Sequence, residues 1–225
     1  MPTILITGAN RGIGKALAES YLHQGWRVIA ARRNANTPAP QGAEPVLLDV
    51  SDADSITALK ADLSGVAIDV LWNNAGVYLD KNQSLAEIDD QQWLQSFQIN
   101  CMAPVRIAEA LIDNVSKSER KIIVFTSSKM GSLTLNGAGA YAYRSSKAAL
   151  NMAVRCIAQD YASTGTSCLL LHPGHVKTDM GGTEGAIDTT TSVQGMQAVI
   201  GRVTAENRQQ YNGGYFDYDG TPIPW

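Results

Sequence analysis

The sequence predicts an α/β fold in which a doubly wound, parallel β-sheet carries helices on both faces. Short aliphatic runs alternate with longer segments whose apolar residues recur at helical spacing. Several of these runs are unbroken rather than alternating with polar residues, as in strands that are covered on both faces. Such an alternation of strands and helices is typical of βαβ units with right-handed crossovers. We expect a single domain over residues 1–225.

The expected elements follow one another along the whole chain. The strands are expected at 3–7, 27–31, 45–50, 69–75, 121–128 and 167–174. The helices are expected at 13–24, 52–63, 89–116 and 141–163. Asp52 and Asp89 stand at the start of the second and third of these helices, where an aspartate can cap the first turn. The Gly/Thr-rich stretch 181–192 is poor in core residues, and we expect a mobile surface loop or lid there.

The composition excludes several classes of function. The chain has 225 residues, 44% hydrophobic and 17% charged, with a formal net charge of −3 and no basic tract, so we expect neither a nucleic-acid partner nor a membrane partner. No apolar run approaches the ~20 residues of a membrane span, and the first residues do not resemble a signal peptide. Cys101, Cys156 and Cys168 form no metal-binding pair, so we expect no metal and a cytoplasmic location.

The motif “TGANRGIG” at 7–14 follows the first expected strand directly and opens the first helix. Gly8 allows a tight turn, Gly12 lets the backbone approach a phosphate, and Gly14 lets the helix pack closely against the strand. The helix N-terminus then faces the anion. The spacing G-x-x-x-G-x-G differs from the general G-x-G-x-x-G pattern. Its position at the first strand-to-helix turn nevertheless predicts a dinucleotide site on a Rossmann-type sheet.

The end of the second strand distinguishes the two nicotinamide cofactors. An acidic residue there would bind a ribose hydroxyl, whereas an arginine accommodates the 2′-phosphate. Here Ala31 is followed by Arg32 and Arg33, and Arg11 adds a positive charge within the glycine loop. Because a guanidinium fork suits phosphate, the sequence favours NADP(H) over NAD(H). Solvated surface arginines are the alternative interpretation.

Six motifs follow one another along the chain: “TGANRGIG”, “NNAG” (73–76), Asn100 in a helix, “SS” (127–128), “YRSSK” (143–147) and “HPGHVKTDM” (172–180). In this order they resemble the short-chain dehydrogenases/reductases, and the resemblance covers essentially the whole chain. “YAYRSSKAALN” and “GGYFDYDGTPIPW” resemble the branch that contains C-factor and Sniffer-type carbonyl reductases. The resemblance implies an NAD(P)-dependent oxidoreductase for a small-molecule carbonyl or alcohol. It also implies a homodimer or homotetramer paired through 89–116 and 141–163.

The resemblance also implies the roles of individual residues. Tyr143 would be the acid/base, with Lys147 as its partner. Ser128 would polarise the substrate and Asn100 would act as the relay residue. The cofactor contacts would come from Gly8, Asn10, Arg11, Gly12, Ile13, Gly14, Arg32, Arg33, Asp49, Val50, Asn74, Ala75, Gly76, Tyr143, Lys147, Pro173, Gly174, Val176 and Thr178. Ser128 lies 15 positions before Tyr143, somewhat farther than is usual in the family, so a slightly longer loop is expected between them.

The chemistry of carbonyl reduction explains these residue types. A tyrosine with an ordinary pKa of about 10 is a poor acid/base at neutral pH. Lys147, one helical turn later on the same face, would favour the tyrosinate and lower that pKa. The alternative role for Tyr143 is helix packing. The alternative for Asn100 is that of a polar surface residue. Ser127 should face away from Ser128 because neighbouring strand residues alternate, and Tyr141 should point roughly opposite to Tyr143.

Two other functions are compatible with parts of the pattern. A sugar-nucleotide epimerase or dehydratase also uses Tyr-x-x-x-Lys, but it usually has a different glycine spacing and a longer C-terminal substrate domain. A dinucleotide-binding sensor or signalling protein of the C-factor type needs the glycine loop but not Ser128, Tyr143 and Lys147 together. The expected substrate pocket lies between 129–142 and 181–192, and its charges do not identify a ligand.

Overall fold

The computed structural model describes residues 1–225 and contains one seven-stranded sheet in the order β3-β2-β1-β4-β5-β6-β7. All neighbouring strands are parallel. The strands are β1 (Thr3–Thr7), β2 (Arg27–Arg32), β3 (Glu44–Leu47), β4 (Val70–Asn73), β5 (Ile122–Thr126), β6 (Ser167–His172) and β7 (Gly214–Asp217). The chain runs outward from β1 to β3 and then returns to β4, so the predicted doubly wound parallel sheet is confirmed. β7 is an additional edge strand that the sequence did not predict.

The helices are α1 (Gly12–His23), α2 (Ala53–Asp62), α3 (Asp90–Phe97), α4 (Ala103–Ser116), α5 (Tyr141–Asp160), α6 (Thr189–Gly201) and α7 (Arg208–Tyr211). Short 3₁₀ turns occur at η1 (Leu85–Glu87), η3 (Lys129–Gly131) and η4 (Ala162–Thr164), and a π-helical turn, η2 (Gln98–Met102), joins α3 to α4. The single helix expected over 89–116 is therefore three consecutive segments. The stretch 181–192 is a loop only in its first part, because α6 begins inside it.

The two predicted helix caps are present. An Asp52 carboxylate oxygen accepts a hydrogen bond of 3.0 Å from the Asp54 N–H at the start of α2. Asp89 accepts one of 3.2 Å from the Gln91 N–H at the start of α3. No helix is both long and apolar enough to cross a membrane.

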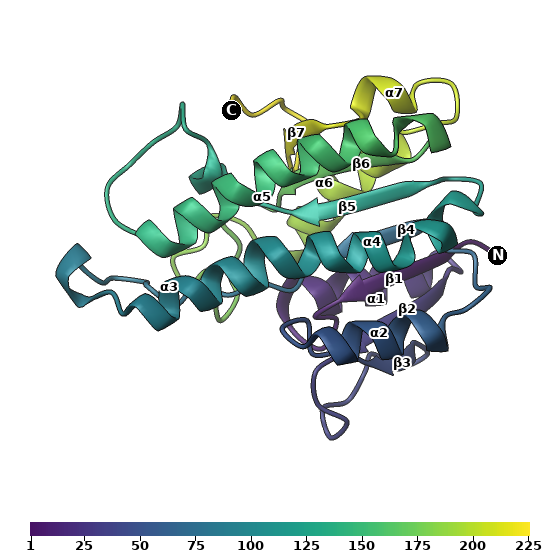
Figure 1. Cartoon of the computed structure of the whole chain (residues 1–225), viewed down its shortest axis with the longest axis horizontal. Coiled ribbons are helices and arrows are strands. Elements are labelled where there is room, and N and C mark those ends of the chain that lie inside the picture. Colours follow the sequence, from purple (N-terminus) through teal and green to yellow (C-terminus); the bar gives the residue numbers. More distant parts are fainter.

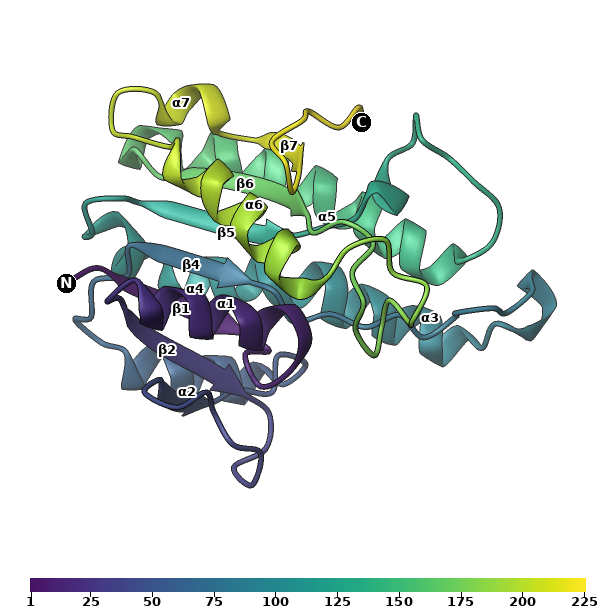
Figure 2. The same cartoon turned by 180° about the vertical axis from the view of Figure 1, so that it is seen from behind.

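Alternate residues of the central strands enter two separate hydrophobic cores. On β1, Leu5 packs on the face that is covered by α2, α4 and α5, whereas Ile4 and Ile6 pack on the face covered by α1 and α6. Figure 1 shows the first of these helix layers in front of the sheet, and Figure 2 shows the second. Both faces are covered, which explains the unbroken aliphatic runs of the central strands.

Because all strands are parallel, the loops that follow them lie along one edge of the sheet. In Figure 1 the strands point toward the start of α5 and the long loop that precedes it. Open α/β sheets bind ligands at this edge, outside the carboxyl ends of their strands. The fold therefore directs the glycine loop, the “NNAG” segment, Ser128 and the start of α5 to the same side of the molecule.

Candidate active site

The glycine loop after β1 is closely packed on the protein side. Gly8 and Gly12 have left-handed backbones with φ of +66° and +52°, which glycine adopts readily. A Cβ atom on Gly14 would lie 2.2 Å from the Gly8 carbonyl oxygen and 2.6 Å from Asn74 Nδ2. The first turn of α1 can approach β1 this closely only because Gly14 has no side chain. Such a cradle at a helix N-terminus fits the phosphates of a dinucleotide.

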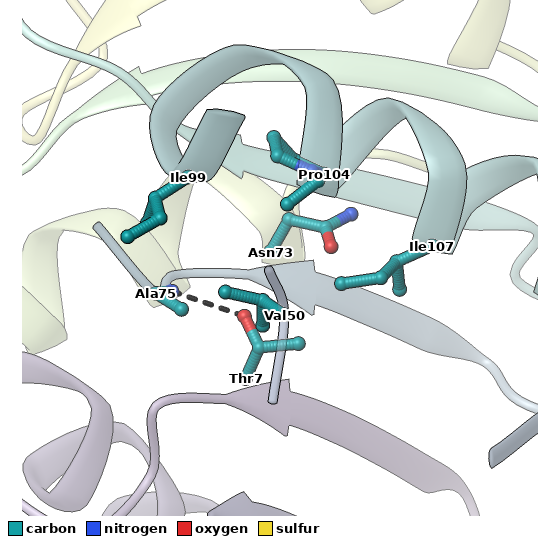
Figure 3. Close-up of a pocket in the computed structure, with 8 residues that line it drawn as sticks. Thr7, Val50, Asn73, Ala75, Ile99, Pro104 and Ile107 are labelled. Carbon is teal, nitrogen blue, oxygen red and sulfur yellow. Dashed lines mark hydrogen bonds between the residues drawn. The ribbon is translucent and has the colours of Figure 1, made fainter. Parts of the chain in front are cut away.

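Thr7, at the end of β1, fixes the neighbouring “NNAG” segment. Its hydroxyl oxygen accepts hydrogen bonds from the Asn74 N–H at 2.9 Å and from the Ala75 N–H at 3.0 Å. Asn74 returns a bond of 3.1 Å to the Thr7 carbonyl. Figure 3 shows Thr7 and Ala75 in a narrow crevice that Val50 also lines. Thr7 was not among the predicted site residues, although its position directly before the glycine motif was a usable signal.

Arg32 and Asp49 lie at the ends of neighbouring outer segments. The Arg32 guanidinium donates to the Thr37 carbonyl, and its buried Nε has no partner among the protein atoms. Arg33 is exposed beside it. Asp49 accepts from the hydroxyl and the N–H of Ser51, and these hydrogen bonds hold the pKa of Asp49 below its ordinary value. A free N–H on Arg32 and the exposed Arg33 fit a 2′-phosphate.

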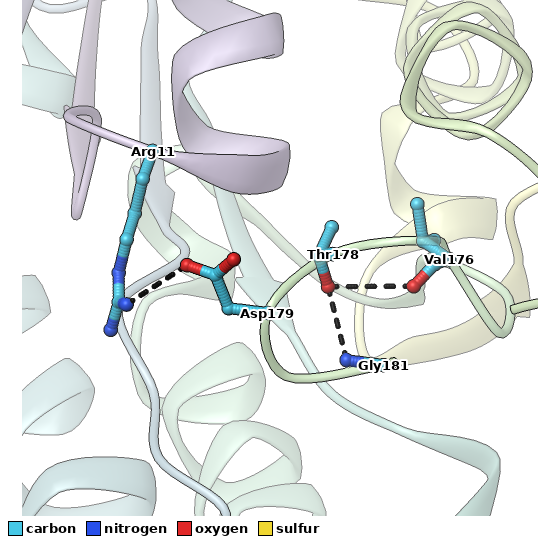
Figure 4. Close-up of polar contacts among 5 residues, drawn as sticks. All are labelled: Arg11, Val176, Thr178, Asp179 and Gly181. Carbon is cyan, nitrogen blue, oxygen red and sulfur yellow. Dashed lines mark hydrogen bonds and ion pairs between the residues drawn. The ribbon is translucent and has the colours of Figure 1, made fainter. Parts of the chain in front are cut away.

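The segment after β6 contacts the glycine loop. Arg11 Nη1 lies 3.2 Å from Asp179 Oδ2, and the Thr178 hydroxyl accepts from the Gly181 N–H at 3.1 Å (Figure 4). A Cβ atom on Gly12 would lie 3.6 Å from the Thr178 methyl group. The exposed fractions of the Arg11 and Asp179 side chains are 74% and 82%, so this ion pair contributes little stability. Arg11 therefore remains available for an anionic ligand.

The first residues of the segment after β6 are held by a hydrogen bond and by close packing. The Pro173 carbonyl accepts a hydrogen bond of 2.5 Å from the Ser192 hydroxyl of α6. Gly174 has a φ of +85°, and a Cβ atom there would lie 2.6 Å from the Ile187 side chain. Val176 is buried. The structure thus places Thr178 beside Gly12 at the start of α1, and Pro173 against α6.

Tyr143 and Lys147 lie one turn apart on the buried face of α5. Tyr143 is 8% exposed, and Lys147 Nζ lies 5.9 Å from the centre of its ring. The Lys147 ammonium group donates a hydrogen bond of 2.8 Å to the Thr126 carbonyl at the end of β5. Ser128, two residues after β5, accepts from the Met130 N–H at 3.2 Å. These three predicted residues therefore meet at the carboxyl end of β5.

Burial has the largest effect on the pKa values of Tyr143 and Lys147. It raises the pKa of Tyr143 to about 12, although a hydrogen bond with Ser128 acts in the opposite direction. Burial also lowers the pKa of Lys147 to about 8. The expected net lowering of the Tyr143 pKa is not found in this structure. Burial of the phenol dominates its pKa, and the Lys147 ammonium group is bound to the Thr126 carbonyl.

Asn100 lies in the π-helical turn η2, where its side chain reaches out of the helix. Its Oδ1 accepts from the Val77 N–H at 2.8 Å, and its Nδ2 donates to the Val77 carbonyl at 2.9 Å and to the Ser146 hydroxyl at 3.0 Å. A Cβ atom on Gly76 would lie 3.1 Å from Asn100 Oδ1 and 3.7 Å from Lys147 Nζ. Gly76 thus leaves the space in which Asn100 and Lys147 approach each other. A π-bulge at such a position is frequent at functional sites.

Ser127 and Tyr141, the alternatives to Ser128 and Tyr143, lie in other surroundings. The Ser127 hydroxyl donates to Asn151 Oδ1 at 2.6 Å within the core. Tyr141 is 38% exposed, in contrast to Tyr143. Two residues that the sequence interpretation missed contact Tyr143 instead. The Tyr78 ring stacks on the Tyr143 ring, with centroids 4.4 Å apart, and the carboxylate of Asp80 accepts from the Tyr143 N–H.

This geometry agrees with the comparison to known proteins. The family model described as short chain dehydrogenase matches residues 2–189. The chain belongs to this family. It is 42% identical over 159 residues to C-signal of Myxococcus xanthus, which covers 70% of this chain and 93% of that protein. Its structure is similar to the carbonyl reductase Sniffer of D. melanogaster, with 31% identity, full coverage of both chains and a TM-score of 0.89. The resemblance inferred from the motifs is confirmed.

A second solved structure of this short-chain dehydrogenase family concerns the cofactor. The NADPH-bound carbonyl reductase from chicken fatty liver is 30% identical, with a TM-score of 0.85 and coverage of 100% of this chain and 99% of that one. The family consists of oxidoreductases that act on small molecules. The cradle around Gly14, the unpartnered Arg32 Nε and the open space at Gly76 are features of this chain that fit a nicotinamide dinucleotide.

A cavity borders part of the segment that was expected to line the substrate pocket. A cavity of about 280 Å³ lies between η3 and the first turns of α5. It is lined by Met130, Gly131, Ser132, Leu133, Asn136, Gly137, Arg144, Ser145 and Ala148. The expected wall at 129–142 thus contributes to a cavity. The other expected wall, 181–192, does not line it, and neither does Tyr143.

Proposed function

We propose that this protein is an NADP(H)-dependent carbonyl reductase or alcohol dehydrogenase that acts on a small carbonyl or secondary alcohol in the cytoplasm. The observation that carries the proposal is the buried phenol of Tyr143, placed one turn from Lys147 on the same face of α5, beside the end of β5 that Ser128 follows. Turnover of NADPH with a panel of aldehydes, ketones and quinones tests it. Absence of turnover on the whole panel, together with tight NADPH binding, would contradict it.

In the proposed mechanism the cofactor, when bound, supplies the hydride, and the protein supplies the proton. With a pKa of about 12, Tyr143 is protonated at neutral pH and can donate its phenolic proton to the substrate oxygen. Ser128 donates a hydrogen bond to the same oxygen as negative charge develops there. The Lys147 ammonium group then stabilises the tyrosinate, and Asn100, which lies beside Lys147 across the Gly76 space, is the proposed relay residue.

Lys147 gives the reaction a pH dependence. We expect kcat for carbonyl reduction to fall as the pH rises through about 8, because Lys147 then loses the charge that stabilises the tyrosinate. Lys147→Arg, which remains charged, should move this fall to higher pH. The measurement is kcat at saturating NADPH between about pH 6 and 10. Lys15→Met, an exposed change on α1, is the control and should leave the profile unchanged. A profile that stays flat through pH 8 would exclude this role of Lys147.

Arg32 is proposed to select NADP(H). Arg32→Ala should weaken NADPH binding by roughly 10- to 100-fold and NADH binding by much less, because a hydrogen bond to a charged group contributes about 1.5–3 kcal/mol. Titration of both cofactors gives the two dissociation constants. Arg27→Ala is a matched control at the other end of β2, where the guanidinium is paired with Glu44. Equal weakening of NADPH binding and NADH binding would contradict the proposed contact between Arg32 and the 2′-phosphate.

A second candidate is a dinucleotide-binding signalling protein, which the similarity to C-signal favours. Such a protein would bind NADPH tightly without turnover on any substrate of the panel.

We also propose a homodimer or homotetramer, because the helices expected to form the contact expose Leu94 on α3 and Met152 on α5. A monomer mass in light scattering would contradict this assembly.

A further inference from the structure

Helix α5 begins without a cap from its own part of the sequence. The residue before it, Ala140, has a left-handed backbone with φ of +53°, Gly139 before that has φ of +73°, and no side chain at this position caps the helix. The first N–H groups of a helix have no partner within the helix. Here two of them are bound by Asp80, which is 62 positions away from Ala142 in the sequence. Oδ2 accepts from the Ala142 N–H at 2.8 Å, and Oδ1 accepts from the Tyr143 N–H at 3.2 Å.

Asp80 is buried to an unusual degree for a cap. Its exposed fraction is 0%, and none of the five ion pairs includes it. A buried carboxylate without a cation is costly unless hydrogen bonds compensate for the lost water. The two N–H groups and the positive end of the α5 dipole provide this compensation.

The segment 77–80 contacts the site at three points. The backbone of Val77 is bound on both sides by the Asn100 amide. The Tyr78 ring stacks on the Tyr143 ring at an interplanar angle of 24°. Asp80 binds the backbone N–H of Tyr143 itself. The ring and the backbone of Tyr143 are therefore held by the same four-residue segment, which is anchored at its other end to Asn100.

We propose that Asp80 is a positioning residue for Tyr143. Its carboxylate fixes where α5 begins and thereby sets the phenol against Ser128 and Lys147. Tyr78, carried on the same segment, restricts the ring. The inference rests on the proposed function, in which the Tyr143 phenol donates the proton.

The chain offers a matched control for this role. Asp52 caps α2 through one bond of 3.0 Å to the Asp54 N–H, and α2 carries no residue of the proposed site. Asp80→Ala and Asp52→Ala thus remove the same kind of interaction at two helices. Asp80→Asn keeps one acceptor oxygen and tests whether partial capping restores part of the effect.

The first measurement is kinetic. Asp80→Ala should lower kcat by roughly 10- to 100-fold, because a small misplacement of a reacting group has an effect of this size. The dissociation constant of NADPH should change by less than about twofold, since the cofactor contacts proposed above do not include Asp80. Asp80→Asn should retain an intermediate kcat. Asp52→Ala should leave kcat at saturating NADPH unchanged even if its melting temperature falls as much as that of Asp80→Ala.

The second measurement does not depend on activity. Amide hydrogen exchange should rise in Asp80→Ala in the peptide that contains residues 141–146 and stay unchanged in the peptides of α2, with the reverse pattern in Asp52→Ala. Unchanged exchange at 141–146, or a kcat equal to that of the wild type, would overturn the positioning role. Failure of both Asp80 variants to fold would also overturn it, since the role would then be global. If wild-type protein shows no turnover, the proposed function fails, and the exchange data alone decide whether Asp80 fixes this backbone.

Discussion

Tyr143→Phe is expected to lower kcat for NADPH-dependent carbonyl reduction by roughly 100- to 10,000-fold, because the variant has no proton to donate to the substrate oxygen. The dissociation constant of NADPH should rise by less than about tenfold, because only one proposed cofactor contact, the Tyr143 hydroxyl, is lost. The measurement is NADPH oxidation at saturating substrate, with cofactor titration on the same samples. Tyr141→Phe is the control: it lies two residues away on the same helix, is partly exposed, and should leave kcat unchanged. Equal turnover of Tyr143→Phe and wild type would refute the acid/base assignment.

The same substitution should leave the fold intact. Only the hydroxyl is removed, and Ser128 still accepts from the Met130 N–H. Loss of one hydroxyl group changes the free energy of unfolding by about 1 kcal/mol. The raised pKa of Tyr143 also determines how stability changes at alkaline pH. Native Tyr143 stays protonated up to about pH 12, whereas in the unfolded chain it ionises near its ordinary pKa of about 10. Wild-type stability should therefore fall between these pH values, and Tyr143→Phe should lack this part of the fall.

The sequence predicted the sheet well and two C-terminal elements poorly, for physical reasons. The central strands are buried on both faces, so their aliphatic runs are unambiguous. Helix α6 starts with Thr189 and two further threonines, which have low helix propensity. Its stability comes from tertiary packing of Val193, Met196 and Ile200 against the core, which local sequence does not reveal. β7 is only four residues long and includes a glycine, so its pattern resembles a turn.

The positions of the proposed site residues were easier to predict than their environment. The i,i+4 spacing places Tyr143 and Lys147 on one face, as the structure has them. The same spacing does not show how deeply they are buried, and burial raises the Tyr143 pKa instead of lowering it. Asp80 was missed because its contact with α5 spans distant parts of the chain. The sequence contains one indication, the lack of a local capping residue: α5 begins after Gly139 and Ala140, with no Ser, Thr, Asp or Asn beside them.

Gly14→Ala is expected to have the second large effect, on cofactor binding and stability together. The added methyl group would lie 2.2 Å from the Gly8 carbonyl oxygen, which is backbone and cannot move aside without distorting the glycine loop. It would also displace the Asn74 amide, which bonds to the Thr7 carbonyl. Overpacking of this severity costs about 3 kcal/mol. Where the loop must regain its original shape to hold the phosphates, this strain energy is lost from binding, with an upper limit of roughly 100-fold in NADPH affinity.

Gly201→Ala provides the matched control for this glycine. Gly201 also lies in a helix, at the end of α6, and a Cβ atom there would have no neighbour within 4 Å. Gly201→Ala should therefore be neutral or stabilise the protein by up to about 1 kcal/mol, because alanine restricts the unfolded chain. Denaturant unfolding and NADPH titration of both variants give the comparison. If Gly14→Ala matched Gly201→Ala in both measurements, α1 and β1 would not be as closely packed as this structure has them, and the phosphate cradle would need to lie elsewhere.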